Sequence, residues 1–174
     1  VVPTDDALRF VGRPTWEAIS RNRVTTSVHD DVPEVRHVAL GQRADLVVVA
    51  PATADLMARM AAGMAGDLAS TLLLATDKPV LIAPAMNVRM WQHPATQRNI
   101  ATLLHHGVTV MQPDEGEMAC GEFGPGRLPE PEVIATKIAE MLARGDANVL
   151  EGQPDFADDD REKPLAGKHV VITA

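Results

Sequence analysis

The chain of 174 residues is poor in cysteine, in aromatic residues and in long apolar runs. Its single cysteine, Cys120, allows no internal disulfide, which removes the usual reason to expect a secreted, disulfide-stapled fold. Aromatic residues make up 3% and tyrosine is absent, which argues against carbohydrate grooves and base-stacking platforms. The apolar runs, such as residues 46–50 and 80–85, are far too short to span a membrane. We therefore expect a soluble, cytoplasmic domain.

Positive charge is also in short supply. The chain carries 16 Lys and Arg against 24 Asp and Glu, a formal net charge of −8. Such a chain repels phosphate backbones unless it has a local basic patch, and none is seen, so we expect no nucleic-acid partner and no membrane partner. The hydrophobic share of 45% supports a sizeable core, and the length corresponds to one domain, at most one and a fragment.

Short apolar runs alternate with helical patterns along most of the chain. Buried strands are expected at residues 44–50, which Pro51 ends, and at residues 79–84 and 108–111. Helices are expected from an N-cap at Thr53 to about Ala75, at 94–106 before Gly107, and at 131–144 before Gly145. This alternation predicts an α/β fold, in which a parallel sheet carries helices on both faces.

In such sheets, ligands bind beyond the carboxyl ends of the strands. The loops that this rule selects are residues 3–7, 51–55, 84–91 and 113–127. Residues 84–91 are the most unusual, because they place Asn87 and Arg89 together in an apolar frame. Asn87 suits a carboxylate or carbonyl and Arg89 suits an anion, whereas Met86, Met90 and Trp91 fit a core equally well.

Residues 51–55 join a strand to the start of a helix, where free N–H groups and the helix dipole suit a phosphate. Plain helix capping explains this turn about as well. The chain contains neither a G-x-G-x-x-G nor a Walker sequence, which counts against a standard dinucleotide or ATP site.

Cys120 stands in the glycine-rich stretch 119–127, which we expect to form a mobile, lid-like loop. There it is a candidate nucleophile or proton donor, with an incidental thiol as the alternative. The histidines, His37 among them, lack the spacing of metal ligands, so no metal site is expected.

Both ends of the chain look cut. Residues 1–4 resemble the tail of a strand, and residues 168–174 form a β-rich run at the other end. Between them, residues 146–163 are acidic and poor in apolar side chains, as in a solvated linker. We expect one domain over residues 1–145, a linker over 146–163, and the truncated start of a further domain over 164–174.

Four segments together resemble the homo-oligomeric flavin-containing cysteine decarboxylases. They are His37-Val38-Ala39-Leu40, residues 44–55 (ADLVVVAPATAD), residues 84–91 as P-x-M-N-x-x-M-W, and Ala119-Cys120-Gly121-Glu122. The likeness is strongest to the decarboxylase part of bacterial bifunctional chains that join a phosphopantothenoylcysteine decarboxylase to a phosphopantothenate–cysteine ligase. Residues 1–145 fit the decarboxylase, and residues 164–174 resemble the opening of the ligase.

The resemblance implies a Rossmann-like, flavodoxin-like fold that lacks its first strand and turn in this chain. It implies FMN as cofactor, and CTP with Mg²⁺ only for the ligase domain. The implied reaction of coenzyme A biosynthesis converts 4′-phosphopantothenoylcysteine to 4′-phosphopantetheine. Oxidation of the cysteinyl thiol to a thioaldehyde creates the electron sink that lets CO₂ leave, and re-reduction follows.

The same resemblance assigns roles to residues of this chain. His37 is the catalytic base, Asn87 holds the substrate carboxylate, and Cys120 is the proton donor of the final reduction. The flavin contacts are Thr4, Thr53, Ala54, Asp55, Ala85 and Met86, and the substrate contacts are Asn87, Arg89 and Met90. Asp55 stands where relatives often have Asn, so its backbone N–H is the expected contact rather than its carboxylate. The glycine/serine turn that helps bind the FMN phosphate in relatives has no counterpart here.

Two other functions remain open at this point. A peptidyl-cysteine decarboxylase of the same family releases an oxidised enethiol and has no need of Cys120. A non-catalytic regulatory scaffold of the same fold has no need of His37, Asn87 or Cys120. The resemblance also implies a homo-oligomer of trimers that assemble into dodecamers.

Overall fold

The computed structural model describes residues 1–26, 36–118, 121–144 and 167–173, with only the backbone described at 36–39. Its strands are β1 (Leu46–Ala52), β2 (Val80–Pro84), β3 (Thr109–Val110), β4 (Asp114–Glu117), β5 (Phe123–Arg127) and β6 (Val170–Thr173). Its helices are α1 (Asp5–Phe10), α2 (Arg13–Ser20), α3 (Arg36–Arg43), α4 (Ala54–Ala61), α5 (Leu68–Ala75), α6 (Val88–Gln92), α7 (Pro94–His105) and α8 (Pro131–Arg144). Within these ranges, no helix has both the length and the apolar character that a membrane crossing requires.

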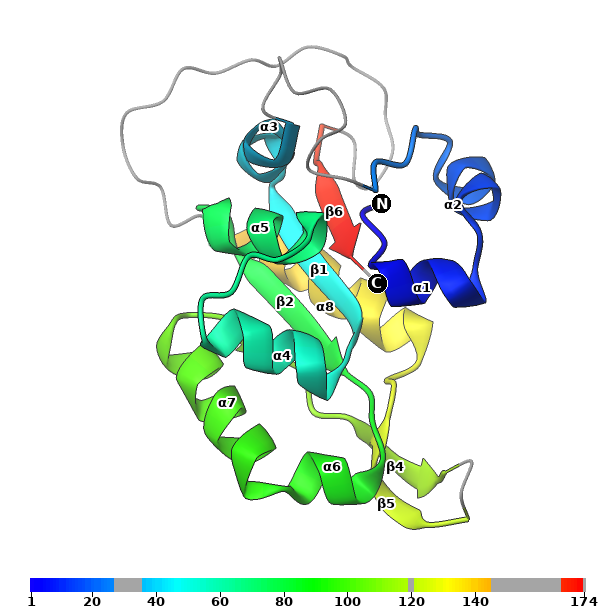
Figure 1. Cartoon of the computed structure of the whole chain (residues 1–174), viewed down its shortest axis with the longest axis vertical. Coiled ribbons are helices and arrows are strands. Elements are labelled where there is room, and N and C mark those ends of the chain that lie inside the picture. The colour runs from blue at the N-terminus through cyan, green and yellow to red at the C-terminus, as the bar shows by residue number, and fades with distance from the viewer. Residues whose placement is uncertain (27–35, 119–120, 145–166, 174) are drawn as a thin grey trace.

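A four-stranded parallel sheet with the order β3-β2-β1-β6 forms the centre of the molecule (Figure 1). Val47 of β1 pairs with Val80 of β2 on one side and with Val171 of β6 on the other. Both faces of β1 are buried, so apolar side chains follow one another along this strand instead of alternating with polar ones.

Helices cover both faces of this sheet, as the alternation of strands and helices predicted. On one face, Val49 and Ile82 share a core cluster with α4, α5 and α7, which contribute Met57, Leu72 and Leu103. On the other face, Leu46, Val48 and Leu81 pack with Met141 of α8. Figure 1 shows α4 and α5 in front of the strands and α8 behind them. The two-sided cover confirms the predicted α/β fold class.

The expectation that Pro51 ends the first strand is wrong, because β1 continues to Ala52. The pairing with β2 shifts its register between Val49 and Ala52, where Ala52 lies opposite Pro84. At such an irregularity the missing N–H of proline costs no ladder hydrogen bond, and the Pro51 side chain is exposed. The extension matters because it sets where the next helix begins.

The single helix expected from Thr53 to about Ala75 is wrong, because the structure has two helices there, α4 and α5. Thr53 is the N-cap of α4, as predicted. Gly63 follows α4 with a φ of 67°, a left-handed conformation that favours glycine. Asp67 then caps α5 through a reciprocal capping box with Ser70. The sequence signal for this break was Gly63 followed by an aspartate at a helix start.

The predictions were accurate for the later helices but missed other elements. Helices α7 and α8 match the expected ranges closely, and Gly107 follows α7 with a φ of 84°. Helices α1, α2, α3 and α6 were not predicted. The loop expected at residues 113–127 contains an antiparallel hairpin instead, in which β4 (Asp114–Glu117) pairs with β5 (Phe123–Arg127) in the glycine-rich stretch.

Residues 170–173, expected to open a further domain, form β6 and pair with β1 of the same sheet. On its other side, β6 forms a bridge from Thr173 to Val2, so it lies between β1 and the beginning of the chain. Residues 170–173 supply backbone partners for β1, because an unpaired β1 edge would leave its N–H and C=O groups without hydrogen bonds. The expected linker 146–163 lies outside the described residues, and the domain boundaries remain a prediction.

Asp67 ties α5 to α4 electrostatically. Its carboxylate lies 2.5 Å from Nη1 of Arg59 and accepts a hydrogen bond from the backbone N–H of Ser70 at 2.7 Å. Desolvation by burial acts to raise the pKa of Asp67, but the hydrogen bonds from Ser70 and the charge of Arg59 outweigh it and lower that pKa. The Asp67 carboxylate therefore binds a proton less readily in the folded state than in the unfolded chain.

We predict that Asp67→Asn lowers the free energy of unfolding by about 1 kcal/mol at pH 7, because asparagine keeps the cap but loses the ion pair. Because the pKa of Asp67 is lower in the folded than in the unfolded state, its carboxylate stabilises the fold at pH values above the unfolded pKa of about 4. This contribution is lost as the pH falls from there through the lowered pKa of the folded state. Urea unfolding at pH 7 and pH 3.5 measures the change. Exposed Asp114 supplies the control variant Asp114→Asn. A wild-type advantage of the same size at both pH values would contradict the prediction.

Candidate active site at the carboxyl edge of the sheet

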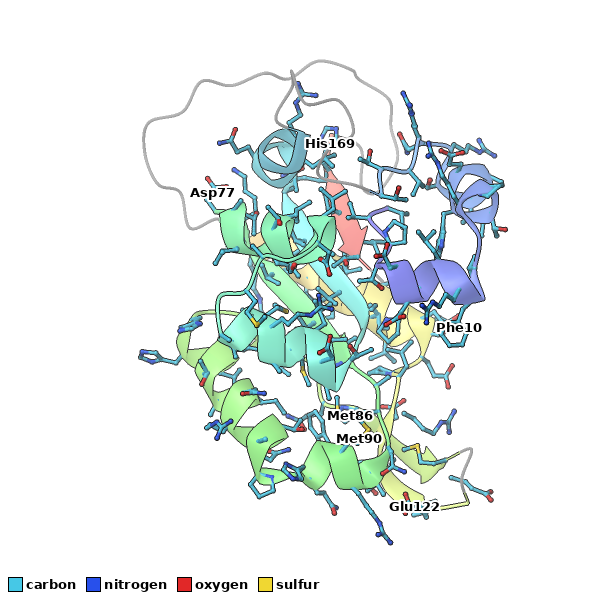
Figure 2. The ribbon with its side chains drawn as sticks, in the orientation of Figure 1. Phe10, Asp77, Met86, Met90, Glu122 and His169 are labelled. Carbon is cyan, nitrogen blue, oxygen red and sulfur yellow. The ribbon has the colours of Figure 1, made fainter. Side chains whose placement is uncertain are left out.

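The carboxyl ends of β1 and β2 bring two of the predicted loops together. Ala52 lies opposite Pro84, and the backbone N–H of Ala85 donates to the carbonyl of Ala52 at 3.2 Å. The next residue, Met86, donates its N–H to the carbonyl of Gly126 in β5 at 2.9 Å. Figure 2 places Met86 and Met90 near Glu122, at the end of the molecule where α6 meets the β4–β5 hairpin. We call this place the carboxyl edge.

Thr53, Ala54 and Asp55 form the start of α4 at this edge. The Thr53 hydroxyl accepts a hydrogen bond from the N–H of Leu56 at 3.2 Å, so its side chain is used for capping. The first N–H groups of a helix have no partner within it, which leaves those of Ala54 and Asp55 for a ligand. Because the helix dipole also favours negative charge there, this turn can hold a phosphate.

The Asp55 carboxylate, which stands where an asparagine was expected, is paired rather than free. It lies 2.8 Å from Nη2 of Arg59, which also binds Asp67. Burial acts to lower the pKa of Arg59, but the hydrogen bonds and charges of Asp67 and Asp55 raise it, so Arg59 stays protonated. This ion pair offsets the negative charge that Asp55 would otherwise present to a phosphate.

Asn87 caps the short helix α6, and both ends of its side-chain amide form hydrogen bonds. Its Oδ1 accepts from the N–H of Arg89 at 2.8 Å, and its Nδ2 donates to Oε2 of Glu122. The other carboxylate oxygen of Glu122 lies 3.0 Å from Nε of Arg89. One carboxylate is thus held by the amide and the guanidinium that the sequence singled out. Glu122 was not predicted as a site residue, although it belongs to the Ala119–Glu122 segment that carried the resemblance.

Two glycines let the β4–β5 hairpin lie directly against residues 86–88. A Cβ on Gly126 would fall 2.2 Å from the carbonyl oxygen of Met86, and one on Gly124 would fall 2.8 Å from Cγ2 of Val88. Only residues without a side chain allow this approach. These glycines were interpreted as a source of loop mobility, whereas here they make room for a close backbone contact.

The remaining site predictions fall in different places. Thr4 caps α1. Two residues earlier, Val2 forms a parallel bridge to Thr173 at the end of β6, so Thr4 also lies at the carboxyl edge. Ala85 and Met86 are half-buried, whereas Met90 and Arg89 are exposed. Cys120 lies outside the described residues.

His37 is not brought to the carboxyl edge by the described backbone. It lies in the first turn of α3, which ends three residues before β1 starts. Thr76, just before β2, donates its hydroxyl to the carbonyl of Gly41 in α3 at 3.2 Å. The short connection to the start of β1 and the hydrogen bond from Thr76 place α3 at the amino ends of the strands (Figure 1). The side chain of His37 lies outside the described residues.

A cavity of about 750 Å³ lies away from this site. It is lined by residues of α4, α5 and α7 and by Asp77 to Val80, at the amino end of β2. Figure 2 shows Asp77 far from Met86 and Glu122. We base the site on the clustered donors of the carboxyl edge, because the cavity contains none of the residues that the sequence singled out.

Comparison with known proteins agrees with the predicted resemblance. The Flavoprotein family model matches residues 1–143. The Coenzyme A biosynthesis bifunctional protein CoaBC of Mycolicibacterium smegmatis is 56% identical over 147 residues, which cover 84% of this chain and 36% of that protein. CoaBC of Mycobacterium tuberculosis is 50% identical over 174 residues, all of this chain and 38% of its own length. The chain thus spans little more than a third of these relatives.

Solved structures give the same family. A PPC decarboxylase mutant complexed with pantothenoylaminoethenethiol is 28% identical with a TM-score of 0.74, covering 82% of this chain and 81% of that one. The FMN-dependent cysteine decarboxylase SpaF is 34% identical with a TM-score of 0.67, covering 83% of this chain and 77% of that one. On the match of residues 1–143 and these identities, the chain belongs to the flavoprotein family, among the flavin-dependent cysteine decarboxylases.

Proposed function

We propose that this chain is an FMN-dependent decarboxylase of coenzyme A biosynthesis, which converts 4′-phosphopantothenoylcysteine to 4′-phosphopantetheine as part of a bifunctional protein with a ligase. One observation carries the proposal: the start of α4, which suits an anion, is joined by the Ala52–Ala85 hydrogen bond to the segment of the Asn87 and Arg89 donors, which hold a carboxylate. The relatives matched over the full chain are named for coenzyme A biosynthesis, which favours this function over the peptidyl-cysteine decarboxylase and the scaffold.

The residues of the carboxyl edge fit FMN. The N–H groups of Ala54 and Asp55 suit its phosphate, with Thr53 setting the turn and Thr4 capping a second helix start at the same edge. Half-buried Ala85 and Met86 offer apolar surface for the flavin ring. FMN, when bound, supplies the redox chemistry that oxidises the substrate thiol and returns the electrons after CO₂ has left.

The chain itself binds the substrate and moves protons. Asn87 and Arg89 orient the cysteinyl carboxylate, and exposed Met90 contacts the neighbouring part of the substrate. The resemblance gives His37 the removal of a proton during oxidation and decarboxylation, and gives Cys120 the donation of the proton that completes the product. Because α3 lies at the amino ends of the strands, this role requires that His37 of a second copy in the proposed homo-oligomer reaches the carboxyl edge. CTP and Mg²⁺ belong to the ligase of the bifunctional protein and not to this site.

A homo-oligomer of trimers that assemble into dodecamers is part of the same proposal. Helices α1 and α2 contain no buried residue, and they leave Phe10 89% and Ile19 73% exposed. A second copy covering these side chains would remove them from water, which supports association. A cytoplasmic location is in keeping with the single cysteine, which allows no internal disulfide.

We predict that the purified chain is yellow and carries FMN at about one per chain. Its visible absorption spectrum, together with mass identification of the released chromophore, is the measurement. Light scattering on the same sample gives the oligomeric state. A folded protein that is colourless and takes up no added FMN would contradict the flavoprotein function.

Replacing His37 by asparagine tests catalysis against a scaffold role. We expect His37→Asn to release CO₂ roughly 10²- to 10⁴-fold more slowly, because a general acid–base contributes about that much. FMN content should stay unchanged. His105→Asn, an exposed histidine of α7, is the matched control and should keep full activity. Full CO₂ release by His37→Asn would exclude this residue as the base.

Replacing Cys120 by serine tests the reductive half of the reaction. We expect Cys120→Ser to release CO₂ but to stop at an oxidised product with the flavin reduced, because serine is too weak an acid to donate the proton. Mass analysis of the products and the flavin absorbance report this. A normal yield of 4′-phosphopantetheine would remove Cys120 from the mechanism.

A further inference from the structure

The carboxylate of Glu122 lies on the donors proposed to bind the substrate. Its Oε2 accepts from Nδ2 of Asn87, and its Oε1 lies 3.0 Å from Nε of Arg89. A hydrogen bond with an ionised partner is stronger than one between neutral groups, so both contacts favour a carboxylate over a neutral acceptor. Figure 2 shows Glu122 at the hairpin end of the molecule, close to Met90.

The Asn87 amide is oriented before any ligand arrives. The bond from the N–H of Arg89 to Oδ1 of Asn87 turns the amide so that Nδ2 points to Glu122. Without an acceptor, that half-buried N–H group would lose a hydrogen bond. The Glu122 side chain is 29% exposed and that of Arg89 86% exposed, so solvent and ligands can reach the pair.

The backbone of Glu122 is also held at this place. Its carbonyl accepts from the N–H of Met118 at 2.7 Å, and the hairpin is joined to Met86 through Gly126. The side chain therefore does not reach Asn87 by chance rotation of a free loop. It extends from a paired backbone toward the Asn87 amide and the Arg89 guanidinium.

We propose that Glu122 is a placeholder for the substrate carboxylate, and that this makes it a specificity-determining residue of the site. The inference rests on the proposed function. In the free protein Glu122 keeps the Asn87 amide and the Arg89 guanidinium paired. A substrate carboxylate displaces it, because two carboxylates on one amide and one guanidinium repel each other. Ligands that lack a carboxylate do not displace Glu122 and gain nothing from these donors.

The alternative role for Glu122 is structural, in which it stays bound and holds Asn87 in place during the reaction. The two roles predict opposite changes. A placeholder competes with the substrate, so weakening it lowers KM. A permanent support assists the substrate, so weakening it raises KM and lowers kcat together.

The experiment compares the full chain with Glu122→Gln, which keeps the size of the side chain but removes its charge. Steady-state CO₂ release from 4′-phosphopantothenoylcysteine gives kcat and KM. Inhibition by 4′-phosphopantetheine, the same molecule without the carboxylate, gives a matched binding constant. Exposed Glu117 on β4 supplies the control, because Glu117→Gln makes the same charge change on the same hairpin.

We expect Glu122→Gln to lower KM for the substrate about three- to fivefold, the strength of an exposed ion pair. The value of kcat should stay within twofold, and the inhibition constant of 4′-phosphopantetheine should not change. Glu117→Gln should resemble the wild type in all three values. If Glu122→Gln does not fold, Glu122→Asp, whose shorter side chain weakens the same contacts, carries the same expectation.

An unchanged or raised KM in these variants would overturn the inference, as would an equal shift for substrate and 4′-phosphopantetheine. In those cases wild-type CO₂ release still stands, and so does the proposed function. A wild-type chain that binds FMN but releases no CO₂ overturns both.

Discussion

The site depends on the backbone of Ala85 and Met86, which is hydrogen-bonded on two sides. Ala85 donates to the end of β1, and Met86 donates to β5 of the hairpin. Through these two bonds a buried parallel strand, a helix start and an antiparallel hairpin meet at one edge. Without them, the start of α4, Asn87 and Glu122 would have no fixed relation to one another. Gly126 allows the second bond, because no side chain fits between its backbone and that of Met86.

Electrostatic pairing gives this edge its chemical character in a chain whose net charge is negative. Asp55 and Glu122, two carboxylates at the edge, each bind an arginine. Arg59 neutralises Asp55 beside the proposed phosphate turn, and Arg89 shares Glu122 with an amide. The edge is therefore suited to the phosphate and carboxylate groups of the proposed ligands, although aspartate and glutamate outnumber lysine and arginine in the sequence.

Local patterns predicted the central elements well, because their causes are local. Continuous β-branched runs gave β1 and β2, and the Thr53 cap gave the start of α4. The break at Gly63 was missed because the helical spacing of apolar residues continued across it. The hairpin was missed because glycines and charges dominate β4 and β5, and their pairing depends on contact with residues 86–88. Glu122 was missed as a site residue because its partner Asn87 is 35 residues away in the sequence.

The pairing of β6 with β1 has a consequence for how the chain folds. The contact between Asp45 and His169, at the start of this pairing, joins residues 124 positions apart. By contrast, β1, α4, α5 and β2 contact one another over short stretches of chain. Because closing a long loop costs entropy before any contact repays it, long-range pairing forms late. The order of assembly should therefore run from β1 and β2 outward, with β6 added last, and the hydrogen-exchange protection of β6 should be the first in the sheet to be lost when the protein is destabilised.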